Sequence, residues 1–162
     1  MYGKPDSCIG CPLYGDGKGF VPDVLWGDTE VQIVAQNPGV DEEMGRMITG
    51  WENGQPIYAS CMPQPLIGRT GWETNKYMKL AGVERFSKSN VLKCRAVDDK
   101  GKKTNKLPSG KLLEEAMDHC TSHHFKFGPS VKYVLAMGAI AWRALGGPGS
   151  ITNWRGFRIP RD

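Results

Sequence analysis

Four of the five cysteines are spaced so that they can serve one metal centre. Cys8 and Cys11 form a Cys-x-x-Cys pair near the N-terminus, a spacing that lets two thiolates reach the same centre. Cys94 and Cys120 stand alone, and they can complete a four-thiolate site. The alternative is a chance Cys-x-x-Cys with two buried thiols, and spacing alone leaves zinc and an iron–sulfur cluster equally open. Cys61 lies in a long loop, and we interpret it as a bystander or buried thiol.

A second candidate for chemistry is the segment 35–43, Ala-Gln-Asn-Pro-Gly-Val-Asp-Glu-Glu, which follows a short apolar run. Loops at the carboxyl ends of parallel strands are where open α/β sheets bind ligands. Asn37 has an amide that can position a water or hold the edge of a base. Asp41, Glu42 and Glu43 can include a general base. The alternative is a turn whose acidic residues favour the start of a helix.

A polar stretch between residues 98 and 111 contains five lysines, which can contact phosphate groups. The alternative is a solvated loop, since a run of like charges is usually just that. Three histidines lie on or just beyond a predicted helix, and we interpret them as solvent-facing or as neighbours of the metal ligands. These residues are Lys100, Lys102, Lys103, Lys106 and Lys111, together with His119, His123 and His124.

Short strands and helices alternate along the chain and must position these residues. Apolar and β-branched runs predict a buried strand at 31–35 and further strands around 91–92 and at 131–137, and a last strand is expected to begin at Phe157. Helical spacing of apolar residues predicts helices at 72–80, 111–125 and 139–145. The segment 40–70 is rich in glycine and proline and predicts a long loop with one helical turn at its start. This alternation predicts an α/β fold with a parallel, doubly wound sheet.

Length and charge limit the classes of protein that remain. With 162 residues the chain is long enough for one domain, 1–162, in which residues 1–30 are an irregular, cysteine-containing arm. The net charge of +4 permits a polyanionic partner without demanding one. No apolar run has the length to span a membrane and no secretory signal opens the chain, so we expect a cytoplasmic protein without a membrane partner. The odd number of cysteines then favours metal binding or buried thiols over disulfides.

The order of several motifs resembles that of the iron–sulfur uracil-DNA glycosylases known as family 4, over nearly the whole chain. The opening Cys-x-x-Cys-Pro-Leu-Tyr, the segment 34–43, Pro-Leu-Ile-Gly-Arg-Thr-Gly at 65–71 and Ser-Asn-Val-Leu-Lys-Cys-Arg at 89–95 resemble family motifs. The runs at 105–108, 134–141 and 151–156 do so as well. The resemblance implies a three-layer αβα fold with a short, mostly parallel central sheet, and it favours a [4Fe–4S] cluster over zinc on the four cysteines.

Roles in DNA repair follow from the resemblance. A glycosylase must flip its target base out of the stack into a pocket. Cleavage of the N-glycosidic bond needs a placed water and stabilisation of the departing uracil anion. The resemblance implies that the 35–43 loop holds the water and that an asparagine amide reads the polar edge of uracil, in single-stranded or uracil-containing DNA. The implied catalytic residues are Gln36, Asn37 and Glu42, the base-binding residues Gly39, Leu66 and Asn90, and the DNA contacts Lys102, Lys103, Lys106 and Arg155.

Three differences from the family pattern lead to an alternative function. Gln36 replaces the usual acid of the first motif, and Gln-Asn-Pro-Gly resembles mismatch-type glycosylases, where the asparagine at the position of Asn37 holds the water. Leu66 replaces a stacking phenylalanine, and stacking is worth about 1–3 kcal/mol per base. The His-Pro-Ser motif is absent, and we expect the portion that carries it to be missing after Asp162.

The alternative is a catalytically degenerate nucleic-acid-binding domain in a bacterial or phage-infected cell. It resembles the N-terminal part of some phage-type DNA polymerases, so the expected partner is a downstream polymerase domain or a replication protein. A third hypothesis, a metal-stabilised protein-interaction module, is weakly opposed by the lysine-rich stretch, because lysines favour a polyanionic partner.

Overall fold

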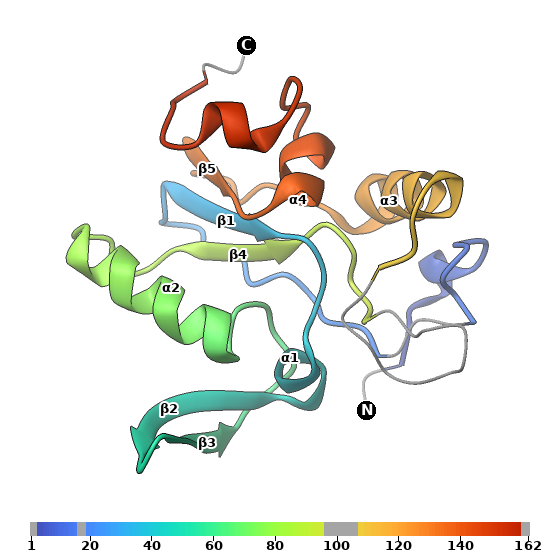
Figure 1. Ribbon diagram of the computed structural model, residues 1–162. Helices are drawn as coiled ribbons and strands as arrows, with labels where there is room; N and C mark the ends of the chain where they lie inside the picture. The colour runs from blue at the N-terminus through green and yellow to red at the C-terminus, as the bar shows by residue number, and fades with distance from the viewer. Residues whose placement is uncertain (1–2, 16–18, 96–106, 160–162) are drawn as a thin grey trace.

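The computed structural model describes residues 3–15, 19–95 and 107–159. A parallel sheet of three strands in the order β4-β1-β5 lies at its centre, and a separate antiparallel pair, β2–β3, projects away from it (Figure 1). The helices and strands, in chain order, are the 3-10 helix η1 (Asp6–Cys8), β1 (Val31–Ala35), α1 (Val40–Met44), β2 (Arg46–Glu52), β3 (Gln55–Ser60), α2 (Arg69–Leu80), β4 (Ser87–Asn90), α3 (Lys111–His124), β5 (Tyr133–Ala136), α4 (Ala139–Ala144) and the 3-10 helix η2 (Ile151–Trp154).

The register of the central sheet brings the carboxyl ends of its strands to one edge. In this register Ala35 at the end of β1 pairs with Asn90 at the end of β4, and Val34 pairs with Ala136 of β5. Both pairings are parallel. The prediction of an α/β fold with a mostly parallel sheet is therefore confirmed. The segments that follow β1, β4 and β5 all start from this edge.

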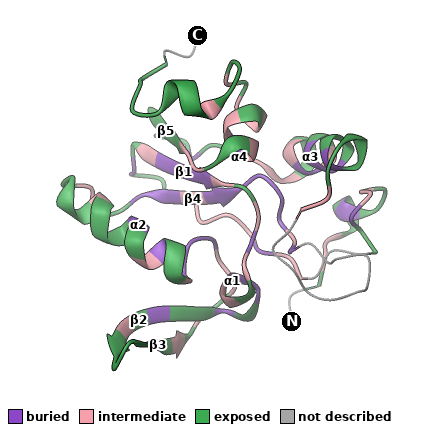
Figure 2. Ribbon diagram, in the orientation of Figure 1, coloured by how far each residue is buried: buried purple, intermediate pink, exposed green. Residues whose placement is uncertain are grey.

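Consecutive residues of β1 face opposite sides of the sheet and fill two clusters of buried side chains. Ile33 packs with Leu66 and Phe86, near Met78 of α2. Val34 packs in the other cluster, which includes side chains of α3 and α4. Because side chains alternate along a strand, one face of β1 meets α2 and the other meets α3 and α4. Figure 2 shows the buried residues concentrated on β1, on β4 and on the helix faces toward them.

The second strand of the sheet lies earlier than the sequence predicts. We expect it around 91–92, whereas β4 is Ser87–Asn90. Its two serines are buried with hydrogen bonds: Gln32 Nε2 donates to Ser89 Oγ at 2.7 Å, and the hydroxyls of Thr29 and Ser87 lie 3.0 Å apart. A strand buried on both faces can carry polar residues where hydrogen bonds satisfy them. Hydrophobic periodicity could not reveal such a strand.

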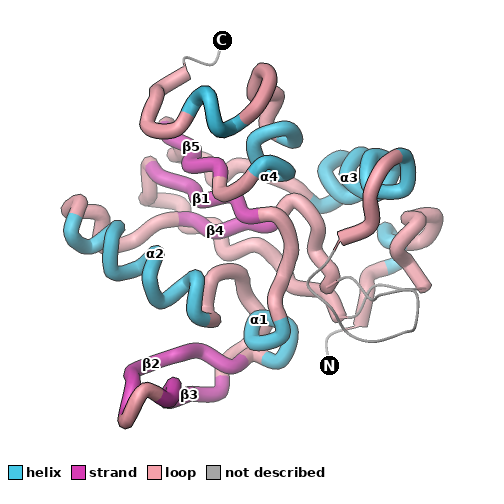
Figure 3. The backbone as a smooth tube through the Cα atoms, viewed as in Figure 1, coloured by secondary structure: helices cyan, strands magenta, loops and turns pink. Residues whose placement is uncertain are grey.

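The prediction of a long loop over 40–70 holds for its helical turn, which is α1, and for residues 61–68, but it is wrong for the segment 46–60 (Figure 3). The segment forms the β2–β3 hairpin, whose strands pair in antiparallel register. Asn53 and Gly54 make the turn with positive φ values of 48° and 76°. An Asn-Gly pair is the strongest short-range signal for a hairpin, because both residues tolerate the left-handed backbone that a tight turn requires. This signal was present in the sequence.

The remaining boundaries agree with the predictions within a few residues. Strand 31–35 is β1, and the helices expected at 72–80, 111–125 and 139–145 are α2, α3 and α4. The strand expected to begin at Phe157 is not formed within residues 107–159, where a 3-10 helix and a turn occupy this part of the chain. None of the helices in the described ranges has the length and apolar character needed to cross a membrane.

Candidate functional site

A pocket opens at the carboxyl edge of the sheet. The loop after β1, the loop before α2 and the residues after β5 surround about 1250 Å³ of space that is continuous with solvent. A location at the strand ends is where ligands bind in open α/β sheets. Its lining residues are Ala35, Gln36, Asn37, Pro38, Gly39, Val40, Asp41, Glu42, Leu66, Gly68, Arg69, Thr70, Gly71, Met137 and Gly138. The pocket thus brings together five of the six residues that we predicted for catalysis and base binding.

Leu66 is held in an unusual backbone conformation at this pocket. Its φ of +58° is in the left-handed region, which a bulky residue rarely adopts. The Leu66 N–H donates to the Glu42 carboxylate, and the Gly39 N–H donates to its other oxygen at 2.7 Å. Gly71 lies against the Leu66 carbonyl so closely that any Cβ there would collide with it. These contacts over-determine the Leu66 conformation, as is typical of ligand-binding sites.

The hydrogen bonds of Glu42 define what its carboxylate can do. The side chain is 8% exposed, and burial raises the pKa of this carboxyl. Both oxygens accept from backbone N–H groups, so Glu42 joins the loop after β1 to the loop before α2. The neighbouring carboxylate, Asp41, forms an ion pair of 2.6 Å with Arg46. Neither acid of the pocket therefore stands without a partner.

The two amides of the loop after β1 are more accessible. Gln36 is exposed and Asn37 is half-buried. Asn37 Nδ2 donates to the carbonyl of Pro38 at 3.2 Å, a weak contact that leaves the rest of the amide available to a water or ligand. Gln36 and Asn37 follow β1 directly, so the sheet fixes the point from which both side chains extend.

Asn90 lies beside this pocket but is not among its lining residues. It pairs with Ala35 in the sheet and is fully buried. Within the described residues, neither Nδ2 nor Oδ1 of its amide has a hydrogen-bond partner. A buried amide without partners costs roughly 1–3 kcal/mol per unsatisfied group. Such a group in a native fold calls for an explanation, and a ligand that supplies the missing partners is one.

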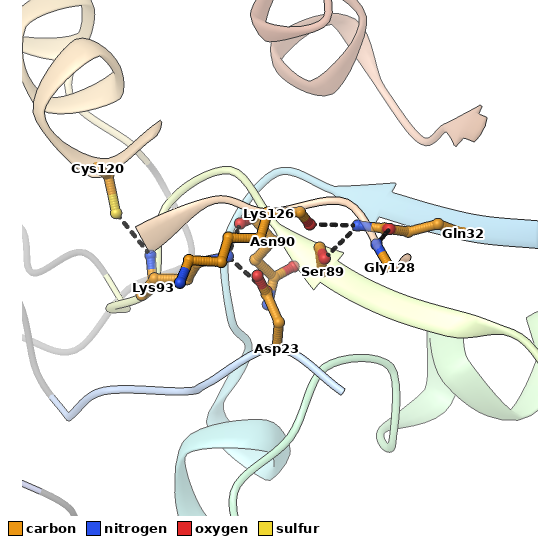
Figure 4. Close-up of polar contacts among 8 residues, drawn as sticks. All are labelled: Asp23, Gln32, Ser89, Asn90, Lys93, Cys120, Lys126 and Gly128. Atoms are coloured by element: carbon orange, nitrogen blue, oxygen red, sulfur yellow. Dashed lines mark hydrogen bonds and ion pairs between the residues drawn. The ribbon is translucent and has the colours of Figure 1, made fainter. Parts of the chain in front are cut away.

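A buried lysine connects Asn90 to the cysteine region (Figure 4). Lys93 Nζ donates to the Asn90 carbonyl at 2.6 Å and pairs with Asp23 at 2.5 Å. The Lys93 backbone N–H lies 3.3 Å from Cys120 Sγ and donates to it. Burial raises the pKa of Asp23, although Lys93 beside it acts in the opposite direction. Sequence reasoning did not single out Asp23 or Lys93, because their pairing depends on contacts 70 residues apart.

The four predicted cysteine ligands line one small cavity on the α3 side of the molecule, with about 280 Å³ of space that is partly open. They come from the N-terminal arm, from the segment after β4 and from α3. Within the described residues, no three His, Cys, Asp or Glu side chains are arranged to hold a single metal ion. Cys61 is not among the cavity's lining residues, which are Lys4, Cys8, Cys11, Leu13, Tyr14, Phe20, Lys93, Cys94, His119, Cys120 and His124.

The chemistry of the cavity suits thiolate ligation. Burial raises the pKa of Cys94 to about 11 and that of Cys120 to about 12, so both are protonated thiols near neutral pH unless a cation binds. Metal binding has to displace these protons. Besides the Lys93 N–H on Cys120, a ring nitrogen of His124 lies 3.3 Å from Cys8 Sγ. Hydrogen bonds to sulfur and an apolar surround are the means by which proteins tune iron–sulfur clusters.

The histidines and the predicted DNA contacts lie in different places. His119 and His124 line the cysteine cavity, whereas His123 is exposed, in agreement with their interpretation as solvent-facing or as neighbours of the ligands. Arg155 is exposed after η2 and is not among the lining residues of the pocket. The predicted contacts at 102, 103 and 106 lie outside the described residues.

Comparison with known proteins gives no family assignment from sequence. No protein-family model matches the chain, and a search of curated proteins finds no significant match. The geometry of the pocket and of the cysteine cavity therefore carries the functional argument.

Proposed function

We propose that this chain is a DNA-binding domain of the uracil-DNA glycosylase type, with a base-binding pocket at the carboxyl edge of its sheet and a [4Fe–4S] cluster on its four cavity cysteines. The observation that supports it most is the buried, unpartnered amide of Asn90 next to that pocket. An amide both donates and accepts, so it matches the adjacent N–H and carbonyl on the edge of uracil. Helix α2 on one face of the sheet, with α3 and α4 on the other, supports the three-layer αβα architecture.

Hydrolysis of the N-glycosidic bond is the activity that this pocket would support. DNA would present the target base extruded from its stack. Asn37, with Gln36 beside it, would orient a water against the sugar carbon as the bond breaks, and Asn90 would stabilise the charge on the departing base. Glu42 would act by position: its carboxylate fixes Gly39 and Leu66, which form the wall against the base. This assignment makes the protein a DNA-repair enzyme.

A second candidate function is binding of a base without cleavage, and the contacts of the two acidic residues of the pocket favour it. Both Glu42 oxygens are occupied by backbone N–H groups, and Asp41 is paired with Arg46. These contacts hold both carboxylates against the protein, whereas a general base must reach the attacking water. The amide of Asn37 in the pocket and that of Asn90 beside it, without a carboxylate aimed at a water, would suit recognition, as in a domain that accompanies a polymerase or another replication protein.

The cysteine cavity fits the proposed cluster through its donor set. Cys8, Cys11, Cys94 and Cys120 supply four thiols to one cavity, as a [4Fe–4S] cluster requires. A cluster spreads its thiolates around several iron atoms, so they need not converge on one point as zinc ligands do. The cluster would supply structural cross-linking of the arm, the segment after β4 and α3. Zinc is the alternative, and metal analysis of protein purified without oxygen distinguishes them.

The test is uracil release from single-stranded DNA, measured together with binding of the same oligonucleotide. Asn90→Asp keeps the side-chain size but removes the amide donor, and Asn37→Ala removes the proposed water contact. For the enzyme we expect release by the wild type, a loss of about 100-fold or more in either variant, and no change in Asn75→Asp, which alters an exposed asparagine of α2.

The two candidates give different outcomes. If the wild type releases no uracil but binds uracil-containing DNA more tightly than the thymine equivalent, and Asn90→Asp removes this preference, the binding function holds. If the wild type shows neither release nor any preference for uracil, both candidates are wrong.

A further inference from the structure

The β2–β3 hairpin carries two aromatic side chains next to the pocket, and each ring is covered by an arginine. The Arg46 guanidinium lies 5.2 Å from the centre of the Tyr58 ring, and that of Arg69 lies 5.6 Å from the centre of the Trp51 ring. We call these four residues the aromatic platform. Figure 1 shows the hairpin extending from the end of the molecule at which α1 lies, below the start of α2.

The register of the hairpin places both rings on the same face. Trp51 pairs directly with Pro56, and Ile48 pairs with Tyr58. Directly opposite residues share a face, and so do residues two apart along a strand, so Trp51, Ile48 and Tyr58 all lie on one side. A register shift between Ile48 and Gly50 inserts one extra residue, which is what brings Trp51 to this side. The acidic Glu52 pairs with Gln55 and therefore belongs to the opposite face.

The rings remain accessible although the arginines hold them. Trp51 is 37% exposed and Tyr58 is 42% exposed, while Ile48 of the same face is buried. Ile48 anchors the hairpin because its N–H donates to the Ile67 carbonyl at 3.0 Å. The platform is thus fixed to the body through its buried residue and presents its aromatic ones.

The platform is continuous with the pocket. Arg69 lines the pocket and opens α2, and within the described residues it forms no ion pair. Arg46 pairs with Asp41, which also lines the pocket. A guanidinium whose charge is not paired with a described carboxylate, at the start of a helix where the helix dipole adds positive potential, suits a phosphate group. The exposed rings suit unpaired bases, since every base has a face that can stack.

We propose that the aromatic platform binds the single-stranded DNA segment adjacent to the base held in the pocket. Bases would stack on Trp51 and Tyr58, and Arg69 would contact a backbone phosphate. A duplex does not offer unstacked base faces, so the partner is single-stranded. This inference rests on the proposed function, because it takes a base in the pocket as the anchor of the strand.

The test is fluorescence anisotropy with a labelled single-stranded oligonucleotide carrying one central uracil. We expect Trp51→Ala and Tyr58→Ala each to weaken binding by about tenfold, the size of one lost base stack. Trp51→Phe keeps a ring and should stay within about threefold of the wild type. Tyr77→Ala, which removes an exposed tyrosine of α2 with Lys76 beside its ring, is the matched control and should leave binding unchanged.

Arg69 gives a second measurement that does not depend on the aromatic variants folding. Arg69→Gln should reduce the slope of log binding constant against log salt concentration by about 0.7, the value for one contact to single-stranded DNA. If the wild type binds the oligonucleotide but Trp51→Ala, Tyr58→Ala and Arg69→Gln all match it, the platform is wrong and the pocket stands. If the wild type binds no oligonucleotide at all, the proposed function fails first.

Discussion

At the scale of single residues, Glu42 stands out because it carries a carboxylate where little water reaches. Its oxygens hold Gly39 and Leu66, and burial raises its pKa more than these hydrogen bonds lower it. In the unfolded chain the same carboxyl titrates at its ordinary value of about 4.3. Between the two pKa values the folded state binds more protons than the unfolded state, so stability falls as pH rises through this window.

We therefore expect the unfolding free energy of the wild type to fall, relative to Glu42→Gln, as pH rises from about 4.3 through the raised pKa. The Gln side chain cannot ionise and should lack this dependence. Urea unfolding at a series of pH values from about 4 upward measures the difference. Glu115→Gln, which changes an exposed glutamate of α3, is the control and should follow the wild type. Parallel curves for wild type and Glu42→Gln would contradict the prediction.

Residue types and spacing could predict part of the cysteine site. Cys8 and Cys11 are three positions apart, and Cys94 and Cys120 line the same cavity with them, as expected. The hydrogen bond between the Leu66 N–H and the Glu42 carboxylate could not be predicted. The two residues are 24 positions apart, and the donor is a backbone N–H, which does not depend on residue type.

At the scale of elements, the start of α2 depends on a close approach of two backbones. Gly71, in the first turn of α2, lies against the Leu66 carbonyl, and Leu66 has its left-handed conformation immediately before that helix. Neither backbone can move without disturbing the Glu42 hydrogen bond to Leu66. The shape of the pocket wall is thus set by a glycine inside a helix.

Gly71→Ala should destabilise the protein by about 1–3 kcal/mol, because its methyl group would force these backbones apart. It should also weaken uracil-DNA binding more than the stability loss explains, since Leu66 would shift. Chemical denaturation and anisotropy measure the two effects. Gly27→Ala serves as the control because nothing lies within 4 Å of its Cβ position. A Gly71→Ala variant of unchanged stability would show that the approach is looser than described.

The elements themselves differ in how far sequence could define them. β1 and α3 follow from periodicity, since one is a short apolar run and the other has apolar residues at helical spacing. β4 could not be found in this way, because Ser87 and Ser89 are hidden by side-chain hydrogen bonds rather than by hydrophobicity. The β2–β3 hairpin could have been found from Asn53-Gly54, and the abundance of nearby glycine and proline concealed it.

At the scale of the whole molecule, one buried chain of hydrogen bonds runs from the cysteine cavity to Asn90, which lies beside the proposed base pocket. Cys120 Sγ accepts from the Lys93 N–H, and the Lys93 side chain reaches Asn90 and Asp23 (Figure 4). We therefore expect a shift of Cys120 to be passed through Lys93 to the backbone of Asn90, the residue that carries the unpartnered amide. In the sequence Lys93 lies between Asn90 and Cys94. Only the fold shows that its backbone N–H contacts Cys120 while its side-chain Nζ contacts Asn90.

If the proposed cluster is present, its removal should impair the pocket as well as the fold. Cys120→Ser should lower the unfolding free energy by at least about 2 kcal/mol, because it removes one ligand of the proposed cluster, which would tie the arm to α3. Cys61 is not among the residues that line the cavity. The unfolding free energy of Cys61→Ser should therefore stay within about 0.5 kcal/mol of the wild-type value.

The link through Lys93 adds an expectation that simple destabilisation does not. Under conditions where Cys120→Ser is still folded by circular dichroism, its preference for uracil over thymine should fall, because Asn90 loses its fixed position. An unselective loss of binding to both oligonucleotides would instead mean that the cluster only stabilises the fold. Retention of the full preference in folded, metal-free protein would show that Lys93 does not couple the two sites.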